Sequence, residues 1–573
     1  MSNDIKSLDS YFHQCYRPDY SLAVLKYNCR ISIFGVFDIQ VLFGKVISRG
    51  YEFEPGAYAE ERFIKIAAPY SIGPPAQFVS FQDNLFNLHR VKWRLKELTN
   101  AVDSILKEFE NGDSVLLFRF NFSKICACLR ELHGQIFFLP SNYNECYSVG
   151  PLCSALQIRY PPLYNGRTAD SISQLTEQIL NKSRKGKRNI TMVIGNKNTG
   201  KSMLTRVLAN SLLGKDRPPP YILDCDVGQP EMNPPGSVSL LKVTSPLLGA
   251  PPFQQRILLS DTYFYGRICI NDDLSSYLVI LRKLLGCFLS DSLSSSPLLI
   301  NTCGWVEGKG ASLLDEMLKL FDPDFVFTFV DSTGSNYMVK QSAMDGNAKP
   351  LVFYGDAIEK PMHMISSSSS LRSLRITAYM AQLCPIPTVK SFADAIPFSV
   401  SFRDVAVLIH TNEPFPSNHI FAVLNCTFVA LCVHNSINQL EEGRRLFGDQ
   451  DMPILLNPDK VDALRVVGYG FIRAVDLEQR IFFISTPLEL SDLQEVNVLA
   501  RGLNIDLPQF FLVSQGRSAI PYVVRERSSS FHTELFRELK IKSVFHRKRF
   551  LRMQSQFMVK KPMYEPMHHV VNI

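Results

Sequence analysis

Long hydrophobic runs are missing from this sequence of 573 residues. The best candidate, residues 420–433, is interrupted by Asn425 and Thr427 and is shorter than the roughly 18 apolar residues that a membrane-spanning helix needs. The first residues, MSNDIKSLDSYFHQ, contain no apolar core of a secretory signal. We therefore expect neither a membrane span nor secretion.

Paired cysteines are missing as well. The 13 cysteines are scattered and odd in number, and no two of them form a C-x-x-C pair. This pattern indicates a reducing compartment. We interpret Cys126 and Cys128 as residues on alternate faces of a short apolar segment rather than as zinc ligands.

A large excess of one charge is also absent, because the formal net charge is only +7. The distribution of the basic residues is therefore more informative than their number. One cluster lies at residues 182–188 (Lys182, Arg184, Lys185, Lys187 and Arg188), and another lies near the C-terminus (Lys542, His546, Arg547, Lys548, Arg549, Arg552, Lys560 and Lys561). Each is typical either of a solvated surface or of a segment for nucleic-acid attraction or nuclear import, and both interpretations stay open.

The composition that is present, 46% hydrophobic and 20% charged residues, is that of an ordinary soluble globular protein. The length predicts about three or four domains. Up to about residue 163, Gly35, Gly44 and Gly50 separate runs of β-branched and aromatic residues at intervals typical of hairpins. This pattern predicts an antiparallel β domain, with a helical insertion at residues 88–110.

The pattern G-x4-G-K-S occurs at residues 195–202 as GNKNTGKS, between an apolar run at residues 190–194 and a helical pattern. The glycines let backbone N–H groups turn towards phosphate oxygens, and the helix start adds a favourable dipole. Lys201, which we expect in solvent when the site is empty, would place its charge on the phosphates, and Ser202 would bind Mg²⁺. The sequence thus predicts a P-loop whose nucleotide-binding residues are Gly195, Asn196, Lys197, Asn198, Thr199, Gly200, Lys201, Ser202 and Met203.

Two carboxylates, Asp224 and Asp226, end the next predicted strand, YILD. A P-loop fold places its second catalytic loop at this point. One carboxylate would bind Mg²⁺ through water, and the other would face an acceptor hydroxyl. The sequence alone does not orient the two, so either residue could take either role.

Alternating strands and helices continue to about residue 385, which predicts a mostly parallel α/β sheet with its ligand at the carboxyl ends of the strands. A third strand, PLLIN, leads into TCGWVEGKG. Trp305 in this segment is one of only two tryptophans in the chain. We interpret it either as a core residue or as a stacking platform for a nucleobase.

The combination of GNKNTGKS, LDCDVGQPEMNPPG, INTCGWVEGKG and LRSLRITAYM resembles the polynucleotide 5′-hydroxyl kinase family. The PEMNPPG run points to its nucleolar branch, which acts on ribosomal RNA precursors, rather than to the kinase subunit of the mRNA cleavage factor. The resemblance covers most of the chain. The N-terminal GVFDIQVLFGKVISRGYEF looks like the family's β-sandwich, and YGFIRAVDLEQRIFFISTPL looks like its C-terminal β domain.

The resemblance implies a role for each site residue. It implies a metal-side role for Asp224 with Ser202, a general base at Asp226, and substrate binding by Gln229 and Trp305. Arg372 and Arg375 follow a serine-rich run at residues 366–370, which we expect to be a flexible hinge, and match the place of the lid arginines that close over the transferring phosphate. Which of the two arginines reaches the phosphate stays open. The implied catalytic residues are Lys201, Asp224, Asp226, Arg372 and Arg375.

The fold that follows is multidomain. A central P-loop α/β kinase domain with a mostly parallel sheet, residues 164–388, is flanked by a β-sandwich-like N-terminal domain, residues 1–163, and by a β-rich C-terminal domain, residues 389–525. Residues 526–573 form a basic tail.

The expected activity is transfer of the γ-phosphoryl group of ATP, with Mg²⁺, to the 5′-hydroxyl of RNA, in the nucleus and nucleolus. The resemblance implies a ribosomal RNA precursor fragment as substrate and an endoribonuclease as partner. An ATP-binding scaffold without turnover is one alternative. A regulatory GTPase is another, because residues 331–334 match a D-x-x-G pattern, but the sequence contains no N-K-x-D motif to read guanine.

Overall fold

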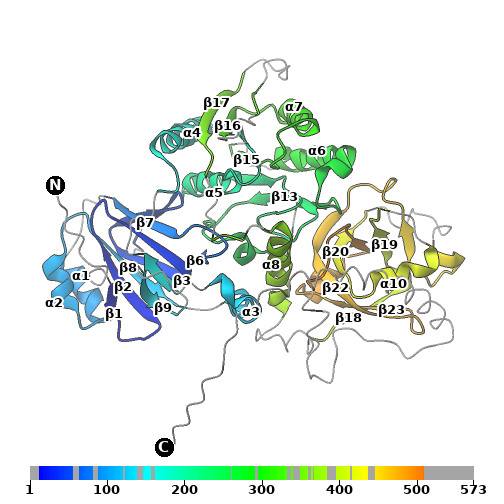
Figure 1. Cartoon of the computed structure of the whole chain (residues 1–573), viewed down its shortest axis with the longest axis horizontal. Helices are drawn as coiled ribbons and strands as arrows, with labels where there is room; N and C mark the ends of the chain where they lie inside the picture. The colour runs from blue at the N-terminus through cyan, green and yellow to red at the C-terminus, as the bar shows by residue number, and fades with distance from the viewer. Residues whose placement is uncertain are drawn as a thin grey trace, which may run out of the picture. The chain divides into compact units, whose positions relative to one another are not determined.

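The fold is described from a computed structural model of the whole chain (Figure 1). The structure describes residues 12–55, 63–81, 88–120, 123–137, 146–151, 153–156, 162–259, 261–290, 295–331, 337–339, 349–358, 363–365, 367–383, 395–412, 416–435, 445–508 and 511. The chain divides into two units, Met1–Val523 and Val524–Ile573, and all described residues belong to the first. No helix in these described ranges is long and apolar enough to cross a membrane.

The N-terminal strands form one antiparallel sheet with the order β1-β2-β8-β3-β7-β4-β5, to which β6, β9 and β10 are added. The 14-residue strand β3 is central, because it pairs with β6, β7, β8 and β10. The bounds are β1 (Phe12–Gln14), β2 (Tyr20–Leu25), β3 (Arg30–Phe43), β4 (Lys45–Ser48), β5 (Tyr51–Phe53), β6 (Ile64–Ala68), β7 (Ala76–Phe81), β8 (Ser114–Arg119), β9 (Cys146–Gly150) and β10 (Cys153–Leu156).

The helical insertion expected at residues 88–110 consists of two helices, α1 (Leu88–Lys96) and α2 (Val102–Glu108). The break follows from a local turn, because the backbone N–H groups of Leu98 and Thr99 both donate to the carbonyl of Leu95. Val91 and Ile105 then pack from the two helices on Leu117 of β8. The apolar residues of both helices therefore belong to one cluster, and the pattern of apolar residues gave no sign of the turn between the helices.

The second sheet contains the predicted P-loop strand. Its order is β17-β16-β11-β15-β12-β13-β14-β22-β20-β24-β19-β21, with β18 and β23 added. The neighbours β17, β16, β11, β15 and β12 are parallel, and β13 and β14 are antiparallel. The bounds are β11 (Asn189–Ile194), β12 (Tyr221–Asp224), β13 (Ser237–Lys242), β14 (Asp261–Phe264), β15 (Pro297–Asn301), β16 (Phe325–Val330) and β17 (Leu351–Asp356). The mostly parallel P-loop sheet is thus confirmed.

Helices cover both faces of this parallel sheet (Figure 1). On one face, α4 (Gly166–Arg184) and α5 (Lys201–Leu212) pack against Val193 and neighbouring strand residues. On the other, α6 (Leu274–Ser290) and α7 (Lys309–Phe321) pack against Met192. Adjacent strand residues point to opposite faces, so β11 is buried on both sides and reads as a continuous apolar run.

The C-terminal strands continue the same sheet, because β14 pairs with β22 through Tyr263 and Arg465. Parallel and antiparallel pairs are both present in this region. The bounds are β18 (Phe398–Ser401), β19 (Ala406–Ile409), α10 (Ile420–Leu424), β20 (Phe428–Val433), β21 (Ile454–Leu456), β22 (Arg465–Asp476), β23 (Ile481–Ser485), α11 (Leu490–Leu493) and β24 (Val498–Arg501).

Two helices next to the site differ from the expectations. Cys126 and Cys128 lie in α3 (Lys124–Leu132) instead of in an extended segment, because the Ser123 side chain caps the helix start by accepting from the N–H of Cys126. The serine-rich run also starts a helix, α8 (Ser368–Met380), in which the Ser367 side chain accepts from the N–H of Ser370. Serine is favourable at such caps. The prediction of a flexible serine hinge is therefore wrong for Ser368–Ser370, whereas residue 366 lies outside the described ranges.

Candidate active site

The P-loop connects the carboxyl end of β11 with the start of α5, as the sequence predicts. Gly200 is the residue before the helix and has φ +103°, which side chains larger than hydrogen rarely adopt. A Cβ at this position would also approach Cδ1 of Ile358 to 2.7 Å. Both facts explain why glycine stands directly before Lys201.

The environment of Lys201 contradicts the expectation of a solvent-exposed ammonium. Its side chain is buried, and Nζ donates to the carbonyl oxygen of Asn196 at 2.6 Å. Burial lowers the pKa of Lys201 to about 8, an effect that the negative charge of Asp226 opposes. The carbonyl oxygen of Asn196 thus accepts the hydrogen bond that a phosphate oxygen would accept from Lys201.

Asn301, which the sequence analysis did not identify, connects the two predicted metal-side residues. Its Nδ2 donates to Oδ1 of Asp224 at 3.0 Å and lies 3.2 Å from Oγ of Ser202. The parallel pairing of β12 with β15 sets Asp224 opposite Asn301. The sequence signal that could have identified Asn301 is a polar residue at the end of the otherwise apolar run PLLIN. The ends of β12 and β15 and the start of α5 therefore bring a carboxylate, an amide and a hydroxyl together, whose oxygen atoms are suited to Mg²⁺.

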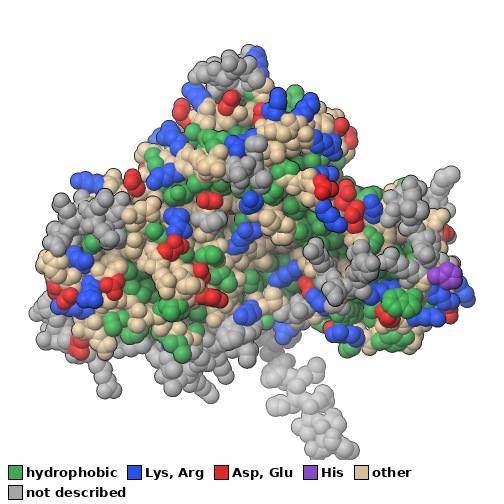
Figure 2. Space-filling view, turned by 180° about the vertical axis from the view of Figure 1, so that it is seen from behind, with side chains coloured by type: hydrophobic (Ala, Val, Ile, Leu, Met, Phe, Trp, Pro, Cys, Tyr) green, Lys and Arg blue, Asp and Glu red, His purple; other side chains and the backbone are tan. Residues whose placement is uncertain are grey.

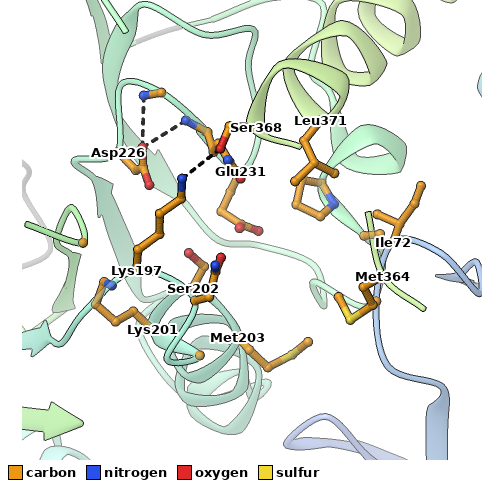
Figure 3. A pocket seen from close by; sticks show the side chains of 18 of the residues that line it. Ile72, Lys197, Lys201, Ser202, Met203, Asp226, Glu231, Met364, Ser368 and Leu371 are labelled. Atoms are coloured by element: carbon orange, nitrogen blue, oxygen red, sulfur yellow. Dashed lines mark hydrogen bonds between the residues drawn. The ribbon is translucent and has the colours of Figure 1, made fainter. Parts of the chain in front are cut away.

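Asp224 is enclosed, whereas Asp226 is half-buried. Burial, together with the negative charges of Glu231 and Asp226, raises the pKa of Asp224 to about 7. The backbone N–H of Glu231 donates to Oδ2 of Asp224 at 2.7 Å and partly opposes this rise. Oδ1 of Asp226 instead accepts from the backbone N–H groups of Gly228 and Gln229 at 3.0 and 2.9 Å (Figure 3). The two carboxylates therefore lie in different surroundings although they are two positions apart.

One cavity of about 880 Å³ collects most of the predicted site residues. Its lining includes these predicted residues: Lys197, Asn198, Gly200, Lys201, Ser202, Met203, Asp226, Gln229, Trp305, Arg372 and Arg375. Asp224 does not line this cavity. It lies behind it, in a small pocket that Ser202, Glu231 and Asn301 share. Gly195, Asn196 and Thr199 belong to the loop but do not line the cavity.

Trp305 lies where the core meets the cavity, a position that fits either of the two interpretations from the sequence. Its side chain is half-buried and packs against the core between the sheet and α6 and α7, while it also lines the cavity. A Cβ on Gly310 would approach Cγ of Trp305 to 2.5 Å. Gly310 therefore leaves the space in which the indole lies.

The two predicted lid arginines lie on α8 and differ in burial. Arg375 is 4% exposed and donates from Nε to the carbonyl of Pro230 at 2.8 Å and from Nη1 to the carbonyl of Leu371 at 3.1 Å. Arg372 is half-buried. Burial lowers the pKa of both guanidinium groups, and the charge of Asp226 opposes this effect at each. At the start of α8, Nζ of Lys197 donates to Oγ of Ser368 at 2.9 Å (Figure 3).

Three charged residues next to the cavity were not predicted. Arg206 forms an ion pair with Glu231 at 3.3 Å and donates to the carbonyl of Gly249 at 2.5 Å. Arg49 reaches the cavity from the N-terminal sheet and donates to the carbonyl of Leu248 at 2.6 Å. Glu231 is 7% exposed, and its carboxylate points into the cavity (Figure 3). Of these three residues, only Glu231 could have been suspected from the sequence, because it lies five positions after Asp226.

The basic cluster at residues 182–188 lies away from the P-loop, because it precedes the amino end of β11 whereas the P-loop follows the carboxyl end. Lys182 forms an ion pair with Asp324, and Arg188 lies 5.2 Å from the ring of Phe288. Figure 2 shows basic and acidic side chains interspersed on one face of the described residues. The C-terminal basic cluster and residues 332–334 of the D-x-x-G match lie outside the described ranges.

Known proteins share these motifs and this fold. The family model described as "mRNA cleavage and polyadenylation factor CLP1 P-loop" matches residues 195–381. A solved structure titled as an extended interface between Pcf11p and Clp1p aligns with 84% of this chain and 98% of its own at a TM-score of 0.51 and 13% identity, which supports the fold.

Two curated relatives match over most of their length. A Caenorhabditis elegans protein named polynucleotide 5′-hydroxyl-kinase nol-9 is 32% identical over 90% of this chain and 93% of its own. The Homo sapiens protein named polynucleotide 5′-hydroxyl-kinase NOL9 is 26% identical over 80% of this chain and 73% of its own. The family expected from the motifs is thereby confirmed, and this chain belongs to the polynucleotide 5′-hydroxyl-kinase NOL9 family.

Proposed function

We propose that this chain is a polynucleotide 5′-hydroxyl kinase that transfers the γ-phosphoryl group of ATP to the 5′-hydroxyl of RNA. The observation that carries the proposal is that the P-loop, Asp226 and Trp305 line the same cavity of about 880 Å³. Such a volume is within the range of small-molecule sites and has room for a nucleotide and a polynucleotide end. The relatives' names describe the same activity.

The P-loop side of the cavity supplies positive charge for the phosphates. The backbone N–H groups at the start of α5 and the ammonium of Lys201 would contact phosphate oxygens. To do so, Nζ of Lys201 exchanges its bond with the carbonyl of Asn196 for a phosphate oxygen. Burial of this group in a site of low dielectric strengthens its attraction for the transferring group.

The oxygen atoms near Asn301 fit a hard divalent cation. Ser202 and Asp224 lie on either side of the Asn301 amide, and among the described residues the buried Asp224 accepts hydrogen bonds from an amide and from backbone N–H groups but from no cationic side chain. We propose that Ser202 and Asp224 hold Mg²⁺, which, when bound, neutralises charge on the phosphate oxygens. Asn301 keeps both oxygen ligands in place.

Asp226 is the proposed general base. Two backbone N–H groups fix Oδ1, so the carboxylate keeps one orientation at the cavity edge. The 5′-hydroxyl oxygen forms a bond with the γ-phosphorus, the bond from this phosphorus to the bridging oxygen of ADP breaks, and the hydroxyl proton moves to Asp226. The indole of Trp305 would stack on the terminal base, and Gln229 lines the same cavity.

The finer parts of the proposal come from the resemblance. A ribosomal RNA precursor fragment is the proposed substrate, an endoribonuclease that leaves a 5′-hydroxyl is the proposed partner, and the nucleolus is the proposed location. The name NOL9 of the relatives supports this location.

The test is a transfer assay with purified full-length protein, labelled ATP and matched RNA and DNA oligonucleotides with 5′-hydroxyl ends. Wild type should label RNA, and Lys201→Ala should lower the rate about 10²–10³-fold, because a preorganised charge is lost. Without ATP, the melting temperature of the variant should stay near that of wild type, since among the described residues the ammonium of Lys201 donates one hydrogen bond, to a loop carbonyl. MgATP should stabilise the variant less than wild type.

Two outcomes would contradict the proposal. If wild type labels no nucleic acid but MgATP still raises its melting temperature, the chain is the ATP-binding scaffold. If Lys201→Ala transfers phosphate at the wild-type rate, the P-loop assignment is wrong.

A further inference from the structure

The PEMNPPG run has no role in the reaction described above, yet the structure holds it firmly. Residues 230–236 lead from the loop of Asp226 to β13 and are buried throughout. Asn233 is fully buried and donates from Nδ2 to Oγ of Ser237 at 2.8 Å. The segment therefore behaves as part of the core although it is neither helix nor strand.

The helix α8 contacts one end of this segment directly and is linked to the other end through Tyr469. At the first end, Nε of Arg375 donates to the carbonyl of Pro230 at 2.8 Å. At the other end, Ser237 is bonded to the hydroxyl of Tyr469 in β22, and the N–H of Tyr469 donates to the hydroxyl of Tyr379 at 2.8 Å. Arg375 and Tyr379 are four residues apart, so they lie on one face of α8.

The segment transmits this contact to the metal-side carboxylate. The residue after Pro230 is Glu231, whose N–H donates to Oδ2 of Asp224 at 2.7 Å. A displacement of Pro230 would move this N–H, because the two residues share a peptide bond. The guanidinium of Arg375 is thus separated from Asp224 by one hydrogen-bonded peptide.

Arg372 lies one turn earlier on the same helix and has no comparable contact. It lines the cavity, and within the described part of the chain the structure shows no hydrogen bond from its guanidinium. Asp226 is the carboxylate whose charge acts on it. Arg372 is therefore placed to meet an anionic ligand, whereas Arg375 donates to two backbone carbonyls, those of Pro230 and Leu371.

We infer that Arg375 is a positioning residue that fixes the Pro230–Glu231 peptide and so the metal-side carboxylate of Asp224, and that Arg372 alone contacts the transferring phosphate. The inference deepens the proposed function and rests on it. It also makes α8 a fixed support of the site rather than a lid that moves as a whole. Tyr469 gives the C-terminal strands a part in the same support.

The experiment compares Arg375→Lys with Arg372→Lys in the full-length protein. The first measurement needs no turnover: the melting temperature with ATP is followed across a Mg²⁺ titration without RNA. The second is the single-turnover rate on a 5′-hydroxyl RNA at saturating Mg²⁺. Thr377→Val is the matched control on α8, because among the described residues the one hydrogen bond of its hydroxyl stays within the helix, to the carbonyl of Ser373.

Arg375→Lys should raise the Mg²⁺ midpoint of the thermal stabilisation about 10-fold or more, the range for residues that orient metal ligands. Its rate at saturating Mg²⁺ should stay within a few-fold of wild type. Arg372→Lys should leave the midpoint unchanged and lower the saturating rate about 10²-fold, because a charge on the transferring group is misplaced. Thr377→Val should change neither quantity.

If Arg375→Lys does not fold, Tyr469→Phe replaces it, since this change removes only the hydroxyl bonded to Ser237 and should raise the midpoint in the same direction. An unchanged midpoint in the folded variant, or a rate loss like that of Arg372→Lys at saturating Mg²⁺, overturns the inference. A wild-type protein that transfers no phosphate overturns the proposed kinase function instead, while the midpoints still report on Arg375.

Discussion

At the scale of single residues, the two carboxylates of the site illustrate how two positions can separate two chemical roles. Asp224 ends β12, and both of its oxygens accept hydrogen bonds, from Asn301 and Glu231. Asp226 lies in the following loop, where Oδ1 alone accepts both backbone bonds. An asparagine keeps one acceptor oxygen and loses the other. Replacement by asparagine therefore removes a hydrogen-bond acceptor in use at position 224 but can preserve both backbone bonds at position 226.

Asp226→Asn is expected to keep the loop intact, since its remaining oxygen can accept from Gly228 and Gln229. The single-turnover rate should fall about 10²–10⁴-fold, the range for loss of a general base, while ATP affinity is unchanged. Asp224→Asn should instead raise the Mg²⁺ requirement. Both are measured with a 5′-hydroxyl RNA across a Mg²⁺ titration. Equal rates for wild type and Asp226→Asn would show that Asp226 is not the base.

His410 gives a prediction for stability as a function of pH. Burial, with the positive charge of Arg267, lowers the pKa of His410 to about 4, against the weaker influence of Asp273 and Asp459. Above pH 6.5, the imidazole is neutral in both states and favours neither. As the pH falls from 6.5 to 4, only the unfolded chain takes up the proton, so the free energy of unfolding decreases.

Between pH 7.5 and 4.5, this histidine should remove about 2.5 kcal/mol of stability. The glutamine in His410→Gln cannot titrate, so this variant should lose about 2.5 kcal/mol less of its free energy of unfolding between the same two pH values. Urea unfolding at the two pH values measures both. Identical losses in wild type and variant would contradict the buried neutral histidine.

At the scale of elements, the start of α7 determines where Trp305 lies. Gly310→Ala should displace the indole, because the added Cβ would approach Cγ of Trp305 to 2.5 Å. We expect RNA binding to weaken by up to about 1–3 kcal/mol, the range for loss of a stacked base. ATP affinity should not change. Dissociation constants for RNA and for ATP measure the two effects.

Gly286→Ala in α6 is the matched control. It is also a helical glycine, but a Cβ there would meet nothing within 4 Å. The control should leave RNA binding unchanged and stabilise the protein by about 0.5–1 kcal/mol, since alanine favours a helix interior. Equal RNA affinities for the two variants would argue against a stacking role for Trp305.

Elements with a long periodic pattern could be predicted from the sequence. The strand β11 and the helix α5 were expected because their apolar positions repeat with one period between clear boundaries. The helix at Cys126 and the one at Ser368 were not expected. Each begins with a serine side-chain cap, and a short polar residue of this type is equally typical of a loop.

At the scale of the whole molecule, the motifs predicted which residues meet but not what surrounds them. The P-loop, Asp226, Gln229 and Trp305 were placed in one site because they end parallel strands or start the following segments. Arg49 and Tyr469 could not be found in this way, since both lie far from the P-loop in the sequence and carry no local pattern. Burial of Lys201 and Asp224 likewise depends on contacts far apart in sequence.

The basic tail gives a prediction for the whole chain, because residues 526–573 follow the last predicted β pattern. Deletion from Lys542 onward should spare phosphorylation of short oligonucleotides and impair nuclear accumulation or complex formation. Activity assays on purified protein and microscopy of a tagged chain measure the two. Replacement of the eight basic residues by glutamine is the control for charge. Loss of short-substrate activity with normal location would contradict this role.

The pairing of β14 with β22 has a consequence for synthesis. Tyr263 pairs with Arg465, a partner that leaves the ribosome about 200 residues later, or roughly 10–40 seconds at about 5–20 residues per second. During this interval, the nascent P-loop sheet presents an unpaired strand edge, together with apolar side chains that β20 and β22 later cover. An open edge of this kind readily adds a strand from another chain. Chains that end before β22 should therefore aggregate, and slow decoding between the two strands should lower the yield of folded protein.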